Sequence, residues 1–475
     1  MDELQKKNQN AKKLDLALQM YDTNRYEMAK PLFEELSKDG NILSTSILGN
    51  YYHYGLDGNT DYKKALAYYR KVIAENEITD VWFELGRMYE DGLGVRKNYR
   101  KAKECFEKAV ENGCVSGYVF LGKLYLFGEG VKRDEKKCYE YFLRAAEGGD
   151  VFAAYRVGCC YLNGTGVEKD INLAEEWLCS AADDGEYFDA CTKLSDLYLD
   201  KKSSKYNPKL ALYYAKRALE LDPIEGEAFL SMFYAVGNAV EKNTEKFLEM
   251  VTRAIDNGSV NGAYLLGKSY MLGNFDLPED MDRAEKYLTI ASEREAGGWS
   301  DYYLGVLYGD TIYKRIDYRK ARFYLERFIN TSSVNTSSSD KGFFEIGWLY
   351  YFGKGIKKNL QKAYEYFKKG TKRGCPDCMA MYANFYDGEK GFPEKPHLTY
   401  KWYKKSMDLG SAWGYLGVLT CYALGVGVKQ NLKKAREMGD YAVKNDMWDK
   451  EIVDDLYRKG ERKAMRKKKT TIGKL

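Results

Sequence analysis

Two cysteines three positions apart have the clearest chemical potential in this sequence. Cys375 and Cys378, in the run Cys-Pro-Asp-Cys, have the spacing of a redox pair or of half a zinc site. A thiolate at the start of a helix would also be stabilised there. Neither a second Cys-x-x-Cys pair nor a strand pattern accompanies them. We therefore interpret them as the start of a helix, with a redox or metal role as the alternative.

Histidines and paired carboxylates add no catalytic arrangement. The chain holds 2 histidines, His53 and His397, which lie far apart in the sequence. This excludes a metal site with several histidine ligands. Adjacent carboxylates such as Asp183 and Asp184 diverge on a helix, so we expect them to be solvated. The sequence therefore predicts a protein that is not an enzyme and has no cofactor.

Five Gly-x-Gly pairs resemble phosphate-binding loops when each is taken alone. A phosphate loop of that kind follows a strand, whereas these pairs recur between segments of helical periodicity. We interpret them as turns between helices. The pairs are Gly92/Gly94, Gly128/Gly130, Gly164/Gly166, Gly353/Gly355 and Gly425/Gly427.

These motifs belong to a unit that repeats along almost the whole chain. Each unit has a small anchor residue, usually glycine, and a tyrosine three positions later. The anchors are Gly49, Gly86, Gly122, Gly158, Ser195, Ser231, Gly267, Gly305, Gly347, Ala383 and Leu419. The tyrosines are Tyr52, Tyr89, Tyr125, Tyr161, Tyr198, Tyr234, Tyr270, Tyr308, Tyr350, Tyr386 and Tyr422.

A second marker, usually alanine, follows each anchor by sixteen or seventeen residues, and most units place a Tyr or Trp three residues after it. This spacing predicts two amphipathic helices per unit, neither of which can bury its apolar face alone. We expect the small anchor to let the two helices approach closely. The tyrosines are then core residues whose hydroxyls bond to the backbone.

The stretch 117–149 shows the unit most clearly: Leu-Gly-x-x-Tyr, Gly-x-Gly-Val, a lysine-rich run, two rings and a closing glycine. This pattern resembles the Sel1-like repeat, a longer-looped relative of the tetratricopeptide repeat, over roughly residues 40–446. The resemblance implies an all-α fold, a right-handed α/α superhelical solenoid of about eleven units with a tetratricopeptide-like N-terminal cap.

We expect three regions. Residues 1–40 form a polar tail, to about residue 13, and a capping helix pair. Residues 41–445 form the solenoid, with a polar insertion at 330–340 that is a linker or, alternatively, a phosphorylated segment at Ser332, Ser333 and 337–339. Residues 446–475 form a capping helix and a basic tail.

Composition gives expectations about compartment and charge. There is no apolar run of about 18 residues, so we expect no membrane span. The first residues are charged where a signal peptide is apolar, and the cysteines suit a reducing compartment, so we expect a cytoplasmic protein. The net charge is +5. The tail Arg458–Lys474 is strongly basic, and such a run binds acidic protein, anionic surfaces or nucleic acid, or only solubilises the chain.

The resemblance also implies where a partner would bind. First helices line the concave face in tetratricopeptide relatives, with exposed positions at −6, −3, +1, +4 and +5 from each anchor. Large rings at such positions are partner anchors or, alternatively, extra core. The acidic candidates are Asp80, Glu90, Asp91, Asp196 and Asp200, and the aromatic candidates are Trp299, Tyr302, Phe344, Trp348, Tyr351, Phe352 and Trp413.

The function implied by the resemblance is a scaffold or adaptor that holds a peptide or helix of another protein in the concave groove. One alternative is a regulator of a nucleic-acid-associated complex that uses the basic tail. Another is an enzyme that binds or hydrolyses β-lactams, as reported for cysteine-rich members of the family. Those members have a disulfide within each repeat, and most units here have no cysteine pair.

Overall fold

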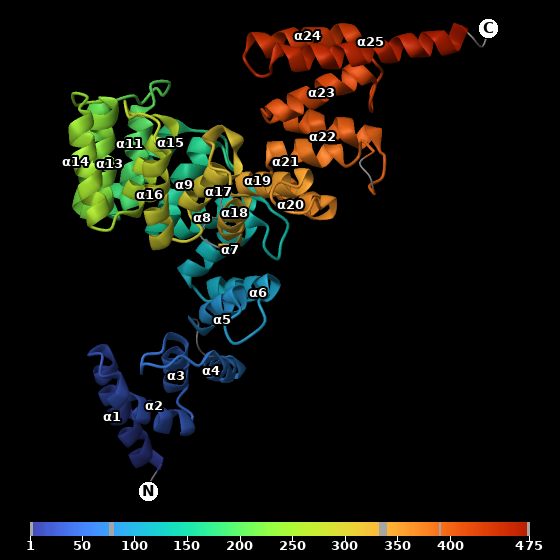
Figure 1. Ribbon diagram of the computed structural model, residues 1–475. Coiled ribbons are helices and arrows are strands. Elements are labelled where there is room, and N and C mark those ends of the chain that lie inside the picture. The colour runs from blue at the N-terminus through green and yellow to red at the C-terminus, as the bar shows by residue number, and fades with distance from the viewer. Residues whose placement is uncertain (1–2, 76–79, 332–339, 389–390, 473–475) are drawn as a thin grey trace. The chain divides into compact units, whose positions relative to one another are not determined.

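The computed structural model describes residues 3–75, 80–331, 340–388 and 391–472. Within those ranges the chain forms 25 α-helices, one π-helical turn and one 3-10 turn, and no strand (Figure 1). The predicted all-α repeat fold is therefore confirmed. Among the described helices, none is long and apolar enough to cross a membrane. The serines considered for phosphorylation, at 332–339, lie outside the described residues.

The helices form two compact units, Met1–Gly226 and Glu227–Leu475. In the first unit a terminal pair, α1 (Glu3–Asp22) and α2 (Tyr26–Lys38), precedes the repeats. The repeat helices of this unit are α3 (Ile42–Tyr54), α4 (Tyr62–Ala74), α5 (Asp80–Asp91), α6 (Tyr99–Glu111), α7 (Val115–Phe127), α8 (Glu135–Glu147), α9 (Val151–Asn163), α10 (Ile171–Cys179) with the π-turn η1 (Ser180–Asp184), α11 (Phe188–Leu199) and α12 (Pro208–Leu221).

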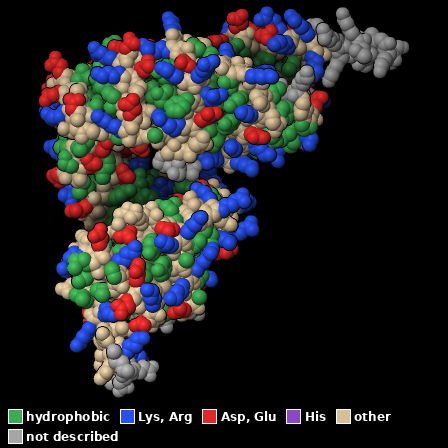
Figure 2. Space-filling view, turned by 60° about the horizontal axis from the view of Figure 1, so that its bottom comes forward, with side chains coloured by type: hydrophobic (Ala, Val, Ile, Leu, Met, Phe, Trp, Pro, Cys, Tyr) green, Lys and Arg blue, Asp and Glu red, His purple; other side chains and the backbone are tan. Residues whose placement is uncertain are grey.

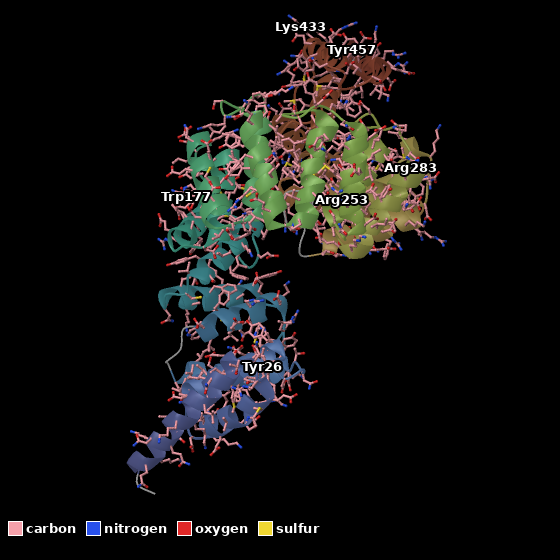
Figure 3. All side chains as sticks on the ribbon, turned by 90° about the vertical axis from the view of Figure 1, so that its left-hand side faces the viewer. Tyr26, Trp177, Arg253, Arg283, Lys433 and Tyr457 are labelled. Carbon is pink, nitrogen blue, oxygen red and sulfur yellow. The ribbon has the colours of Figure 1, made fainter. Side chains whose placement is uncertain are left out.

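Helix α13 (Pro223–Val236) spans the boundary, and the second unit continues the same alternation of first and second helices. Its helices are α14 (Thr244–Asp256), α15 (Val260–Leu272), α16 (Met281–Arg294), α17 (Trp299–Gly309), the 3-10 turn η2 (Thr311–Tyr313), α18 (Tyr318–Asn330), α19 (Asp340–Phe352), α20 (Leu360–Arg373), α21 (Pro376–Asn384), α22 (Pro396–Asp408), α23 (Ala412–Leu424), α24 (Leu432–Lys444) and α25 (Lys450–Ile472). Arg253 of α14 illustrates how a helix pair is tied, because its Nε donates to Glu227 of α13 at 2.8 Å (Figure 3).

The polar tail expected up to about residue 13 is helical from Glu3 onward. Helix α1 begins at Glu3 and packs against α2. Ion pairs hold its first half, with Lys6 Nζ at 2.9 Å from Asp39 and Lys13 Nζ at 2.5 Å from Glu35. The first helix of the predicted capping pair therefore begins at Glu3, before its apolar pattern, which starts at Leu14.

Anchor glycines leave the space that a second-helix side chain fills. A Cβ on Gly86 would lie 2.5 Å from the ring of Phe106, and one on Gly347 would lie 2.6 Å from the ring of Phe367. Both rings are fully buried. The filling residue follows the alanine marker by four positions, so it is not the Tyr or Trp that most units place three positions after the marker.

The tyrosine after each anchor closes the loop of its unit. In all eleven units its backbone carbonyl accepts a hydrogen bond of 2.7–3.1 Å from the first residue before the second helix. That residue is Asp or Asn in ten units, and its side chain caps the helix, as Asn359 does for Lys362 N–H at 3.0 Å. The exception is Lys395, which precedes Pro396 and makes no side-chain cap.

We predicted that the hydroxyls of these tyrosines bond to the backbone, but within the described residues they do not. Their rings lie against the second helix, as in the stacked pair Tyr350 and Tyr366 at 5.7 Å. In eight units a Lys or Arg covers the ring, as Lys362 does at 5.1 Å from the Tyr350 centroid. Several hydroxyls bond to side chains of the preceding unit instead, because the residue after the alanine marker projects towards them.

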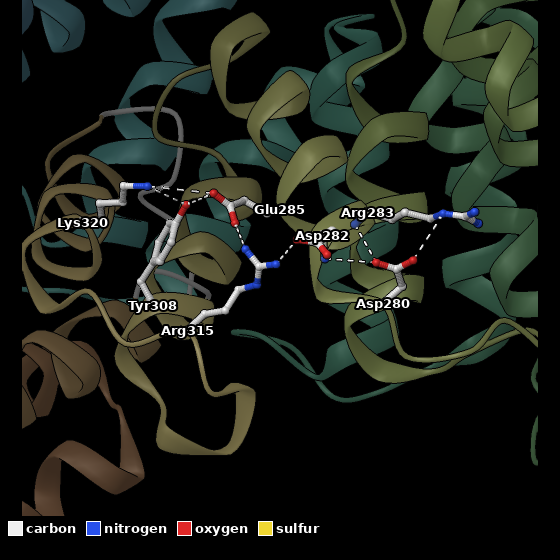
Figure 4. Close-up of polar contacts among 7 residues, drawn as sticks. All are labelled: Asp280, Asp282, Arg283, Glu285, Tyr308, Arg315 and Lys320. Carbon is white, nitrogen blue, oxygen red and sulfur yellow. Dashed lines mark hydrogen bonds and ion pairs between the residues drawn. The ribbon is translucent and has the colours of Figure 1, made fainter.

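The same three-residue contact, which we call a clamp, joins neighbouring repeats at two places in the chain. The Tyr198 hydroxyl donates to Glu175 at 2.6 Å, and Lys205 Nζ donates to the other oxygen of Glu175 at 2.5 Å. In the second unit Tyr308 and Arg315 share Glu285 in the same way (Figure 4). These clamps bond the second helix of one repeat to the first helix and loop of the next.

The Gly-x-Gly pairs are turns, as predicted. Both glycines of each pair have positive φ, for example +79° at Gly92 and +68° at Gly94, a conformation that favours glycine. A Cβ on Gly94 would lie 2.6 Å from the carbonyl oxygen of Tyr62. The second glycine therefore lets the loop lie directly on the preceding repeat.

Candidate interaction surfaces

The cysteine pair has a structural role. Cys375 is the residue before α21, where its sulfur accepts from Cys378 N–H; both thiols are buried, and neither forms a disulfide. Burial of thiols in an apolar core removes their reactivity. Within the described part of the chain, no group of three or more His, Cys, Asp or Glu side chains is arranged to hold a metal ion.

The two histidines have different surroundings in the structure. His53 is buried, with Nδ1 3.3 Å from the Tyr69 hydroxyl and 3.4 Å from Glu84. Burial, followed by the nearby charge of Arg87, lowers the pKa of His53. His397 is exposed in the first turn of α22.

Surface charges of both signs are mixed with apolar side chains on the face that Figure 2 shows. The charge on this face therefore does not identify a binding site. Candidate sites are described below from individual residues of the first helices. The predicted positions on α17 and α19 fall in the second unit, and those on α5 and α11 fall in the first.

Four of the aromatic candidates pack partly into the core of the second unit. Trp299 and Tyr302 of α17 lie edge-to-face with centroids 5.5 Å apart, and both contact Phe328. Phe344 of α19 lies 6.3 Å from Phe367. Tyr351 packs against Phe385 and Phe367 at 5.7 and 6.4 Å. These four partly buried rings extend the core towards the surface.

Two rings of α19 form an outer layer beside these four. Phe352 is 50% exposed. Its centroid lies 4.6 Å from that of the partly buried Trp348, and Lys354 Nζ lies 5.9 Å from the Trp348 centroid. We call Tyr302, Phe344, Trp348, Tyr351 and Phe352 the aromatic wall. Trp413, 39% exposed, is separate because it packs against Trp448 at 4.9 Å.

A buried ion pair holds α17 in place behind the wall. Asp301 is fully buried, and Arg327 of α18 donates to both of its carboxylate oxygens. Gly297 N–H also donates to Asp301 at 2.8 Å. A fully bonded carboxylate of this kind fixes the orientation of the helix start.

Glu345 lies in the wall and was missed from the sequence. It lies two positions before the anchor Gly347, and this position is not among the exposed positions expected from tetratricopeptide relatives. Trp348 and Phe352 follow it by three and seven residues, so the three side chains lie on the same side of α19. Burial, then the charges of Asp310 and Asp377, raise the pKa of Glu345 to about 7, while Lys341 opposes the shift. The Glu345 charge in turn helps to raise the pKa of Tyr302.

The acidic candidates of the first unit lie on α5 and α11. Asp80, Asp91, Asp196 and Asp200 are exposed and Glu90 is partly buried. Burial, then the charges of Asp91 and Glu129, raise the pKa of Glu90 to about 7. Desolvation also raises the pKa of Asp196.

The expectation of an acidic face is incomplete, because a row of cations runs between these carboxylates. Arg87 and Lys123 occupy position +1 on α5 and α7, and Arg156 and Lys193 occupy position −2 on α9 and α11. All four are partly buried. We call them the cation row. Position +1 belongs to the exposed positions expected from the related repeats, whereas position −2 does not, so only Arg87 and Lys123 could be expected from that rule.

A family model for the Sel1 repeat matches ten segments: 45–75, 83–114, 115–150, 151–186, 188–223, 260–295, 300–330, 344–375, 376–411 and 415–442. These segments cover most of the chain. The chain belongs to the Sel1 repeat family. The helix pair α13 and α14 lies between matches, so the structure supplies the eleventh unit that the tyrosine spacing predicted.

Curated relatives match over a short stretch. Protein sel-1 homolog 2 of mouse and of human are each 29% identical over 86 residues, 18% of this chain and 12% of their own length. The chain therefore spans about an eighth of these relatives.

Solved structures with similar folds include c5321, a protective antigen of uropathogenic Escherichia coli, with 22% identity, coverage of 91% of this chain and 90% of that one, and a TM-score of 0.47. A Sel1 repeat protein of Oxalobacter formigenes has 28% identity, coverage of 54% and 100%, and a TM-score of 0.43. Sel1 and tetratricopeptide-like repeat proteins generally act as protein-interaction scaffolds and are typically non-catalytic.

Proposed function

We propose that this Sel1 repeat protein is a non-catalytic scaffold that binds a peptide or helix of a partner protein on the aromatic wall of α17 and α19. The supporting observation is the pair Trp348 and Phe352, which lie beside partly buried rings packed into the core while half of Phe352 remains exposed. Large rings held rigidly at a surface are typical of interface hot spots.

The wall favours a partner segment that combines an apolar and a cationic side chain. Trp348 and Phe352 offer ring surface, and Glu345 offers a carboxylate one helix turn away on the same stripe. Asp310 and Asp377 add negative charge near it. A Lys or Arg of the partner would relieve the cost of ionising Glu345 in this setting, while the adjacent apolar residue covers the rings.

The remaining candidates belong to the same proposal. In the second unit, Trp299 supports Tyr302, and Trp413 forms a lesser patch with Trp448. In the first unit, separate candidate contacts for basic side chains of a partner are Asp80, Glu90, Asp91, Asp196 and Asp200. The scaffold acts in a reducing compartment such as the cytoplasm, consistent with ten free cysteines. The same free thiols weigh against the disulfide-linked β-lactam enzymes.

A selection from random peptides displayed on phage tests the proposal. The wild-type protein should enrich peptides in which Lys or Arg neighbours an aromatic or aliphatic residue. The variant W348A/F352A should lose their capture while keeping its helical circular dichroism. The matched control F323A removes a ring that is 55% exposed on the second helix α18 and should bind as wild type does. Equal capture by W348A/F352A would refute the wall as the site.

The basic tail supports a second candidate, a nucleic-acid-associated role. The described part of α25 carries Arg458, Lys459, Arg462 and Lys463 on one continuous helix. Gel-shift titration with single-stranded RNA should show binding that is lost on replacing these four residues with Gln if the tail acts in this way. Unchanged binding would dismiss it.

A further inference from the structure

We propose that the cation row of the first unit, Arg87, Lys123, Arg156 and Lys193, is a docking surface for an acidic polypeptide segment. The four residues lie at the middle of four successive first helices, α5, α7, α9 and α11. This site is independent of the aromatic wall, which belongs to the other unit. It also reverses the charge expected there from the sequence.

The cations face one another across these helices. Lys123 of α7 reaches α9, where its Nζ lies 5.0 Å from the ring centroid of Phe152, and it lies 4.7 Å from the ring of Phe120 on its own helix. Burial is the largest cause that holds the pKa of Lys123 below its ordinary value; the charges of Arg156 and Arg87 add to this effect, whereas those of Glu90 and Asp150 oppose it. Arg156 and Lys193 both act on Cys159, which lies between them in sequence.

None of the four side chains forms a close ion pair in the described structure, although the charges of Glu90 and Asp150 act on Lys123 from farther away. Across residues 3–75, 80–331, 340–388 and 391–472, no carboxylate oxygen lies within 4.0 Å of a charged nitrogen of these four side chains. Arg156 Nε is moreover buried without a hydrogen-bond partner in the described structure. Buried donors are rarely left unpaired, and four unpaired cations on one face repel one another. An anionic ligand would accept a hydrogen bond from Arg156 Nε and reduce the repulsion among the four cations.

The surroundings favour a polypeptide over a nucleic acid. Glu84 and Glu90 lie beside Arg87 on α5, and Asp196 lies beside Lys193 on α11. Carboxylates at both ends of the row would repel a continuous phosphate backbone, whereas a peptide can place its own acids only opposite the cations. The faces of Phe120 and Phe152 are covered by Lys123, so they do not offer stacking platforms for bases.

Fluorescence anisotropy with a labelled peptide tests the proposal on the full-length protein. The probe is rich in Glu with Leu at every third position, and the matched probe has Gln in place of Glu. The acidic probe should bind, the Gln probe should not, and affinity should fall as salt is raised. R156Q and K123Q should each weaken binding by at least about ten-fold, because each removes one member of a partly buried charge pair.

Controls separate this surface from general charge and from the aromatic wall. K216Q removes an exposed lysine of α12 and should leave the affinity unchanged, as should W348A/F352A. Thermal melting identifies any variant that fails to fold, and R156K then replaces R156Q, with an expected loss of the contact at Nε but retained salt dependence. Wild-type affinity in both R156Q and K123Q, or tighter binding of a single-stranded RNA than of the acidic probe, would overturn the proposal.

Discussion

At the scale of single residues, anchor glycines act through the volume that they leave empty. A Cβ on Gly305 would lie 2.6 Å from Leu325 Cγ, whereas a Cβ on Gly309 of the same helix would lie 3.4 Å from Ala321, an ordinary contact. We predict that G305A destabilises the fold by about 1–3 kcal/mol through overpacking. G309A should be neutral or stabilising by about 0.5–1 kcal/mol, since alanine favours the helix. Urea unfolding measures both, and equal effects would contradict the packing argument.

Glu345 gives a prediction about pH, because burial raises its pKa to about 7 from an ordinary value of 4.5. Between these values the folded state binds more protons than the unfolded state, so the stability contribution falls as pH rises from 4.5 through 7. The variant E345Q stays neutral and should raise Tm at pH 8 but hardly at pH 5. The exposed residue Glu293 provides the control E293Q, which should leave Tm unchanged at both pH values. An equal gain for E345Q at both pH values would speak against the ionisation of Glu345 as the cause.

At the scale of elements, the clamps between units couple neighbouring helices. A double-mutant cycle of Y198F and E175Q should give a coupling of about 1 kcal/mol, because the hydroxyl and carboxylate bond directly at 2.6 Å. Y125F is the matched control, since the Tyr125 hydroxyl makes no hydrogen bond within the described structure and its ring is equally buried. It should cost less than about 0.5 kcal/mol. A coupling near zero would mean that the clamp adds nothing beyond ring packing.

Helices and turns could be predicted from the sequence because all eleven units share the tyrosine spacing and five of them share the Gly-x-Gly turn. Tyr350 and its counterparts mark the first helix, and pairs such as Gly92 and Gly94 mark the loop. The hydroxyl partners could not be predicted, since Glu175 meets Tyr198 only after the units stack. The first half of α1 was missed for a similar reason: ion pairs such as Lys6 with Asp39 hold it, and its own sequence has no apolar stripe.

At the candidate sites the sequence identified the helices that carry the binding residues but not all the charged side chains on them. Trp348 and Phe352 were found because large rings at exposed positions are unusual. Glu345 and Arg156 were missed because both occupy position −2, which the rule taken from related repeats does not include. Whether Tyr351 was core or surface depended on Phe385 of the next unit, which periodicity within one repeat does not show.

At the scale of the whole molecule, the two units present different chemistry. The second unit offers rings around an acidic residue, and the first offers unpaired cations. We predict that R156Q leaves binding of peptides selected on the aromatic wall unchanged within two-fold, measured by anisotropy. A loss larger than about ten-fold, equivalent to 1.4 kcal/mol, would show that the two surfaces are coupled.

Hydroxyl-radical footprinting with a peptide selected on the wild-type protein tests the central claim most directly. Mass spectrometry then reports the oxidation of each ring with and without peptide. The account predicts that oxidation of Trp348 and Phe352 falls on binding, while the similarly exposed rings Phe323 and Tyr213, on second helices, react as before. Protection of Phe323 or Tyr213 with unchanged reactivity of Trp348 and Phe352 would contradict it.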